Sequence, residues 1–279
     1  MIPRSPIIYF HGMPGSPREL NLFGRVTAGD AIYAPDRNKR NHRSAPNELD
    51  ALAAMIQARH SAGQVRIIAF SLGALPALRV AARLGPLVAC LDLVSPAAPL
   101  ETGEYHEMAG GPVFRLAKRS PRLFSQLVGL QALAARYAGS VLYAGLFATA
   151  RGADRDIMRR RHFRTTMMMV LADCFADGAI KYRTEIQGYV TPWTSVLAEV
   201  EQPVTLWHGE ADNWGPCRDD RRTPGRLAQR SRCSSLSWSV SLFNSGGRVE
   251  RAPRSPVGVG TEGFRYLIML NCRATNRST

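Results

Sequence analysis

The sequence predicts an α/β protein built on one mostly parallel β-sheet. In the first hundred residues, short apolar runs alternate with stretches of helical spacing, and glycine- or proline-containing turns separate them. Strands that are joined through helices pair in parallel by right-handed crossovers. A long helical stretch follows before strand character returns near Pro203. We therefore expect a helical segment inserted between two strands of the sheet.

Each expected element follows from its local pattern. Apolar runs that end near turn residues predict strands over residues 7–10, 31–34, 65–70, 88–94 and 203–207. Helical spacing predicts helices over 49–58 and 73–84 between the strands, and over 113–138 and 155–176 in the inserted segment, which has glycine breaks at 110–111 and 178. The run Met167-Met168-Met169 is expected in a helix core, with a substrate-facing surface as the alternative.

The end of the chain differs in composition from the rest. Residues 217–279 contain twelve Arg and no Lys, and they carry +8 of the net charge of +14. Apolar residues there follow neither the helical nor the strand period over any length. We therefore expect the final strand and helix to be missing or replaced by an irregular tail. The chain thus divides into a core, a helical cap and a tail, which cover residues 1–99 with 199–216, 100–198 and 217–279, respectively.

Composition argues against several classes of protein. No run of eighteen apolar residues exists, so neither a membrane span nor a membrane partner is expected. Five scattered cysteines predict no disulfide framework and no zinc site, and the N-terminus has no signal-peptide pattern. Together these features predict a cytoplasmic protein. The basic tail could bind nucleic acid, but no aromatic or motif order accompanies its charge, so no nucleic-acid partner is expected.

Ser71 lies in the first of three segments that fit one mechanism. Ala69-Phe70-Ser71-Leu72-Gly73 stands directly between an expected strand and an expected helix. A serine on so sharp a turn has its hydroxyl exposed at the carboxyl edge of the sheet, and small residues at Ala69 and Gly73 permit the close backbone approach. A tight turn with an incidental serine is the alternative.

Two further loops provide the other parts of that mechanism. The segment His11-Gly12-Met13-Pro14-Gly15-Ser16 follows the first strand, and the N–H groups of Met13 and Leu72 are the natural donors to an oxyanion. The segment His208-Gly209-Glu210-Ala211-Asp212 follows the strand that ends at Trp207, and Asp212 can orient a histidine base there. An ordinary glycine turn and a solvated carboxylate are the respective alternatives.

These segments resemble the α/β-hydrolase superfamily in order and spacing, over about residues 5–216. The resemblance is carried by H-G-x-P-G-S, A-P-D-R, the serine elbow and H-G-x-x-D-x-x-x-P, and it is greatest to capped hydrolases grouped with epoxide hydrolases and small carboxylesterases. Epoxide hydrolases have an aspartate at the elbow, so Ser71 implies ester, amide or related acyl chemistry on a small molecule. Ala69 in place of the usual glycine, and the segment 37–44 after A-P-D, depart from the superfamily pattern.

The resemblance also implies a role for each site residue. It implies an α/β-hydrolase fold with a helical cap, no cofactor and no metal. Ser71 is the implied nucleophile and Asp212 the implied acid, and the oxyanion hole consists of Met13 and Leu72. The residues expected to support the loop and the elbow are His11, Gly12, Gly15, Ala69 and Gly73.

The base is missing from this set. The superfamily takes it from a histidine after the acid, but the six histidines are residues 11, 42, 60, 106, 162 and 208, all before Asp212. Without a base, serine is a weak nucleophile at neutral pH. We therefore expect an impaired serine hydrolase whose catalytic histidine is unassigned. A catalytically inactive, hydrolase-like binding protein is the alternative.

A slip of the reading frame near Cys217 is the hypothesis that explains the missing histidine. Read one nucleotide later, the codons of Trp238 and Ser239 force a glycine. Residues 239–244 then permit Leu-Ser-His-Tyr-Ser-Thr, which resembles the superfamily's histidine loop at the right distance. Residues 217–227 permit an alanine-rich helix in the same frame. The bias of 33 Arg to 3 Lys fits GC-rich DNA, in which shifted alanine codons read as arginine.

Overall fold

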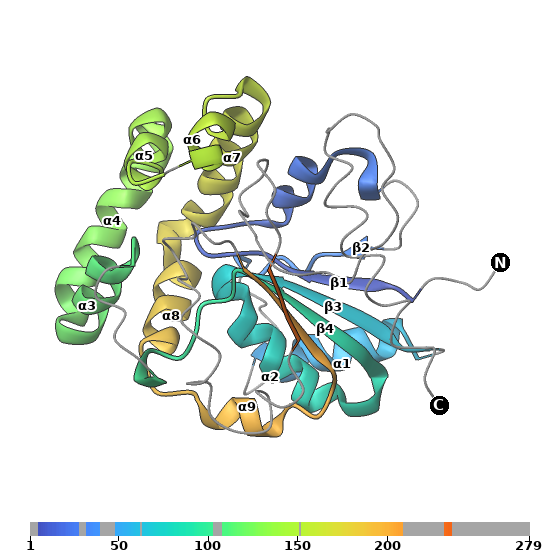
Figure 1. The fold of residues 1–279 in the computed structure, drawn as a ribbon. Helices are drawn as coiled ribbons and strands as arrows, with labels where there is room; N and C mark the ends of the chain where they lie inside the picture. The colour runs from blue at the N-terminus through green and yellow to red at the C-terminus, as the bar shows by residue number, and fades with distance from the viewer. Residues whose placement is uncertain are drawn as a thin grey trace.

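The computed structural model describes residues 5–27, 32–39, 48–61, 63–102, 108–150, 152–208 and 232–235. Within these ranges, six strands form one sheet in the order β2-β1-β3-β4-β5-β6, and every neighbouring pair is parallel (Figure 1). The strands are β1 (Ile7–Phe10), β2 (Ile32–Tyr33), β3 (Val65–Phe70), β4 (Val88–Val94), β5 (Val204–His208) and β6 (Arg232–Ser235). The expected α/β class with a mostly parallel sheet is confirmed.

Three helices accompany the sheet. They are α1 (Glu48–Arg59), α2 (Ala74–Leu84) and α9 (Ser195–Glu199), and α2 packs against both of the others. Leu75, Leu78 and Val80 of α2 are buried, so this helix presents a wide apolar surface to the core. Short 3-10 segments complete this part of the chain: η1 (Pro17–Thr27), η2 (Ser71–Gly73), η3 (Gly85–Leu87) and η4 (Leu100–Thr102).

The segment between β4 and β5 is helical, as expected. It contains α3 (Gly111–Arg119), α4 (Pro121–Tyr137), α5 (Gly139–Leu146), α6 (Gly152–Ile157), α7 (Arg161–Cys174), η5 (Ala176–Ala179) and α8 (Ile180–Tyr189). We call residues 111–189 the helical insertion, which stands beside the sheet in Figure 1. The single helix expected over 113–138 is two helices, because Ser120 leaves helical backbone angles and Pro121 begins a new helix. No helix in the described ranges is long and apolar enough to cross a membrane.

The two faces of the sheet bury different sets of side chains. Alternate residues of β1 separate the two sets: Ile8 and Phe10 join the large core that α1, α2 and the insertion share, whereas Ile7 and Tyr9 join a smaller cluster with Trp207. Met167 is buried in the large core, Met168 packs against it and Met169 is exposed. The expectation that the methionine run belongs to a helix core therefore holds for its first two residues.

One segment of the tail, Arg232–Ser235, joins the sheet as β6. β6 pairs with β5, from Thr205 opposite Arg232 to His208 opposite Ser235. Parallel strands pair through hydrogen bonds between backbone N–H and C=O groups. The open edge of β5 can therefore pair with an extended segment in which apolar and polar residues do not alternate. The apolar run at 264–270 lies outside the described residues.

Candidate active site

Ser71 occupies the turn from β3 into α2. Its φ is +51°, a left-handed value that is strained for a residue with a side chain and is typical of functional turns. The turn is also tight: a Cβ atom on Gly73 would lie 2.5 Å from the His11 carbonyl oxygen and 2.6 Å from that of Phe10. Ala69, two residues before the serine, is fully buried. Gly73 therefore stands where the backbone of the turn closely approaches the end of β1, and Ala69 is packed in the core.

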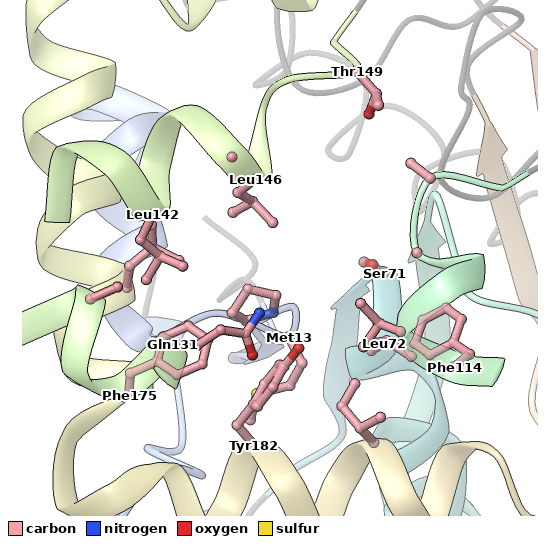
Figure 2. Close-up of a pocket in the computed structure, with 18 of the residues that line it drawn as sticks. Met13, Ser71, Leu72, Phe114, Gln131, Leu142, Leu146, Thr149, Phe175 and Tyr182 are labelled. Atoms are coloured by element: carbon pink, nitrogen blue, oxygen red, sulfur yellow. The ribbon is translucent and has the colours of Figure 1, made fainter. Parts of the chain in front are cut away.

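Ser71 lines a cavity of about 450 Å³ between the sheet and the helical insertion. Figure 2 shows Ser71, Leu72 and Phe114 on one side of this cavity and Leu142, Gln131 and Phe175 on the other. Most of the lining residues are apolar, and Gln131, Thr149 and Tyr182 are among the few polar ones. A concave, mainly apolar cavity with a few polar groups is the usual form of a small-molecule site.

Met13 and Leu72 line the same cavity as Ser71. Their backbone N–H groups donate to no acceptor in the described part of the chain. An oxyanion hole requires two such N–H groups near a reactive hydroxyl. The structure thus brings together three of the residues that the sequence singled out.

The loop of residues 11–16 folds around a buried carboxyl group that sequence reasoning missed. Glu19 is 3% exposed and accepts hydrogen bonds from the Tyr9 hydroxyl (2.8 Å) and the Gly12 N–H (3.2 Å). Burial raises its pKa to about 7, against the opposing effect of these hydrogen bonds. A Cβ atom on Gly15 would collide with Glu19 Oε1 and with the backbone of Gly12. The spacing Ser16-x-x-Glu19, which is that of a helix capping box, could have drawn attention to this residue.

His11 is buried at the start of this loop. Its Nδ1 lies 2.9 Å from the Gly12 carbonyl oxygen, and its Nε2 has no hydrogen-bond partner within the described residues. Burial, followed by the charge of Arg37, holds the pKa of His11 well below its ordinary value. The ring is therefore neutral at physiological pH and donates from Nδ1. This environment agrees with a supporting role in the loop.

Within the described residues, neither His60 nor His162 forms a hydrogen bond with Ser71. His60 stands between α1 and β3, at the opposite end of β3 from Ser71. His162 Nε2 lies 3.2 Å from the Asn21 carbonyl oxygen. Among the described residues, no hydrogen bond to Ser71 Oγ is present. The structure does not describe His42, His106 and Asp212. For His208 it describes the backbone, which belongs to β5, but not the side chain.

Several polar contacts tie the helical insertion to the loop of residues 11–16 and its neighbours. Arg37, which sequence reasoning left without a role, donates to both carboxylate oxygens of Glu185 in α8 (2.9 and 3.0 Å) and to the His11 carbonyl oxygen (2.9 Å). Asp173 of α7 accepts hydrogen bonds from Ser16 and Arg18. These contacts fix one wall of the cavity relative to the loop that would bind an oxyanion.

The sequence matches no protein family profile and no curated protein. Solved structures do match. An α/β hydrolase enzyme, MGS-M2 from a Medee basin deep-sea metagenome library, gives a TM-score of 0.55 at 15% identity, over 88% of this chain and 83% of that chain. A putative lipase (lip1) from Acinetobacter baumannii AYE gives a TM-score of 0.55 at 14% identity, over 77% of this chain and 70% of that chain. MenH from S. aureus gives a TM-score of 0.50 at 12% identity, over 82% of this chain and 84% of that chain.

The protein has the α/β-hydrolase fold. In α/β folds of this kind, ligands bind beyond the carboxyl ends of the parallel strands. Ser71 follows β3 at that edge, and the cavity opens beside it. Within the described part of the α/β-hydrolase fold, no three His, Cys, Asp or Glu side chains gather in a group that could hold a metal ion.

Proposed function

We propose that this protein is a serine hydrolase that cleaves a small ester, amide or related acyl substrate through Ser71. One observation supports the proposal most strongly: a serine with φ of +51° at a strand–helix turn shares an apolar cavity with two uncommitted backbone N–H groups. A fold does not by itself imply a function, so the proposal rests on this site. That solved relatives of the fold include an α/β hydrolase enzyme and a putative lipase is consistent with it.

The proposed reaction proceeds by acyl transfer. Ser71 Oγ attacks the carbonyl carbon, its proton passes to a base, and the carbonyl oxygen becomes an oxyanion that accepts hydrogen bonds from Met13 and Leu72. The bond to the leaving group then breaks, the leaving group takes up a proton, and the acyl group remains on Ser71. Water hydrolyses this ester in a second step, which releases the acid and restores the serine.

Both steps require a base, and the chain is impaired in this respect. Asp212 is the proposed acid of the triad, but no histidine follows it in the sequence. The remaining donors to the oxyanion retain part of the rate enhancement when a triad member is lost. Slow acylation therefore persists, whereas deacylation, which must activate water, is slower still.

We assign the parts of the chain to this function as follows. Residues 1–99 and 199–216 form the catalytic core, and residues 100–198 form a cap that supplies the apolar side of the cavity. Residues 217–279 are the product of a slipped reading frame near Cys217. In this assignment the chemistry needs neither cofactor nor metal. A cytoplasmic location stays a prediction.

Covalent labelling tests the nucleophile. A fluorescent organophosphonate should label the protein at Ser71, as peptide mapping by mass spectrometry would show, and Ser71→Ala should abolish the label. Ser95→Ala is the matched control, because Ser95 also ends a central strand with a positive φ of +42°. Full labelling of Ser71→Ala, or a label that maps to Ser95, would overturn the assignment. Absence of any label in the parent protein would favour a binding protein without catalysis.

A further inference from the structure

Large apolar side chains are exposed together on α4 and α5. Leu123, Leu130, Leu133, Tyr137 and Val141 are between 54% and 71% exposed. Among the described residues, only two other large apolar side chains reach the exposed class, Met55 in α1 and Met169 in α7. Scattered apolar residues need no explanation, but a concentration of five on two consecutive helices indicates a contact surface. We call these five residues the outer stripe.

Helical spacing makes the outer stripe continuous along α4. Steps of seven, three and four residues lead from Leu123 to Leu130, Leu133 and Tyr137, which places all four on one face of the helix. The opposite face of α4 is already in the core, where Phe124 and Val128 are 0% and 1% exposed. A helix that is apolar on both faces needs a partner on its outer face. α4 and α5 form the edge of the molecule that lies away from the sheet (Figure 1).

The outer stripe leads into the cavity of the candidate active site. Leu130 of α4 and Val141 of α5 are exposed members of the stripe, and both also line the cavity that Ser71 shares. Leu130 and Val141 therefore connect the outer stripe to the cavity that Ser71 lines. An occupant of the outer stripe that carries acyl chains would have a direct route to Ser71.

The charged side chains of the segment that carries the outer stripe are all basic. Residues 108–150 contain five basic side chains and no Asp or Glu. Arg122 and Arg136 are exposed neighbours of the stripe in α4, and the Arg136 guanidinium lies over the Tyr137 ring. Lys118 and Arg119 are exposed at the end of α3. A second copy docked about a two-fold axis would bring like charges together, which is unfavourable, whereas an anionic surface would complement them.

We propose that α4 and α5 dock on an anionic lipid surface, with the outer stripe among the acyl chains and the flanking Lys and Arg side chains at the headgroups. Amphipathic helices with basic flanks bind membranes in this way without spanning them. The lack of a spanning segment, from which no membrane partner was expected, therefore does not bear on this mode of binding. A second part of the proposal, which rests on the proposed hydrolase function, is that the acyl chain of a lipid ester enters between Leu130 and Val141.

Vesicle binding tests the docking. The full chain should sediment with vesicles of phosphatidylcholine and phosphatidylglycerol but not with phosphatidylcholine alone, and high salt should weaken binding because charges are screened. The double variant Leu133→Glu/Tyr137→Glu should lose at least about tenfold in affinity. Neither of these residues lines the cavity, so organophosphonate labelling of Ser71 should be unchanged and would show that the variant is folded. Met55→Glu, on α1, is the matched control and should bind like the parent.

Each outcome decides between the two proposals. Equal binding by the parent and the double variant, or no preference for anionic vesicles, would overturn the docking while leaving the labelling of Ser71 intact. A dimer in gel filtration that the double variant converts to a monomer would overturn it in favour of self-association. Vesicle binding that is lost in the double variant, in a protein whose Ser71 takes no label, would support docking and contradict the hydrolase function.

Discussion

The carboxyl group of Glu19 is buried within the loop whose shape it determines. It accepts hydrogen bonds from Tyr9 and Gly12, and Arg37 is the cation nearby. Burial nevertheless dominates and raises the pKa of Glu19 to about 7 from an ordinary 4.5. Because the loop contributes Met13 to the proposed oxyanion hole, the protonation state of Glu19 bears on both stability and the site.

The raised pKa predicts that the protein loses stability as the pH rises. Below pH 4.5 the carboxyl group is protonated in both states; above it, the unfolded state ionises while the folded state holds its proton until about pH 7. The folded state binds more protons over this window, so the free energy of unfolding should fall by up to about 3 kcal/mol. Urea unfolding at pH 5 and pH 8 should show this fall in the parent and a smaller one in Glu19→Gln. An equal fall of the free energy of unfolding in both proteins would contradict the raised pKa of Glu19.

Gly73 is the second residue on which the site depends. A Cβ atom there would lie 2.5 and 2.6 Å from two backbone oxygens at the end of β1, and backbone cannot yield as a flexible side chain can. Gly73→Ala should therefore cost about 1–3 kcal/mol of stability, the usual cost of overpacking. It should also lower organophosphonate labelling of Ser71.

A second glycine provides the control for this prediction. Gly129 lies within α4, and a Cβ atom there would meet nothing within 4 Å. Gly129→Ala should stabilise the protein by about 0.5–1 kcal/mol, because alanine loses less backbone entropy in a helix. Thermal unfolding of the two variants measures both effects. If Gly73→Ala proved as stable as Gly129→Ala, the close packing at the elbow would be wrong.

The ion pair of Arg37 with Glu185 is one of the contacts between elements that hold the helical insertion in position. The Arg37 side chain is 6% exposed and binds Glu185 of α8 through two parallel hydrogen bonds. Arg18 and Asp173 join the same two parts of the molecule, but their side chains are 51% and 37% exposed. The two ion pairs therefore allow the stability contributions of a buried and an exposed pair to be compared.

A double-mutant cycle for each ion pair measures its coupling energy. Arg37→Met should cost about 3 kcal/mol, because it leaves a carboxylate and a carbonyl oxygen without their donor, and Glu185→Gln should cost less. Arg18→Met and Asp173→Asn should each cost less than about 1 kcal/mol, because solvent screens an exposed pair. Urea unfolding gives the four values and the two coupling energies. Equal coupling in the two pairs would contradict the structural role given to Arg37.

Local patterns predicted most of the elements, and the exceptions have physical reasons. The bounds of β3 and β4 agree with the expected ranges, because each is an apolar run between turn residues. The break at Pro121 separates α3 from α4 within a continuous apolar period. β6 could not be predicted from side-chain pattern, since only its backbone pairing with β5 defines it.

The candidate site was predictable where a residue acts through its own motif. Ser71, Leu72 and Met13 stand at fixed places in short segments, and all three line one cavity. Arg37 was not predictable in this way, because Glu185 lies 148 residues further along the chain. Roles that depend on distant partners leave no local signal in a single sequence.

At the scale of the whole molecule, an α/β-hydrolase fold is joined to a basic segment of which the structure describes only β6. The elbow and the loop of residues 11–16 are in place, whereas the sequence has no histidine after Asp212. If the reading frame slipped near Cys217, restoring it should supply the histidine and raise ester turnover by about a hundredfold or more. Sequencing the nucleotides across codons 210–250 would show whether the slip is present.

In the proposed mechanism, Ser71 forms an acyl-enzyme that this chain cannot turn over efficiently. Rapid mixing with an activated short-chain ester, followed by intact-mass and peptide analysis, tests it most directly. We predict a burst of released alcohol that approaches one equivalent per protein, an acyl group on Ser71, and slow turnover afterwards, because deacylation lacks its base. The burst should vanish in Ser71→Ala. Rapid steady turnover without acyl-enzyme, or the same burst in Ser71→Ala, would contradict this mechanism.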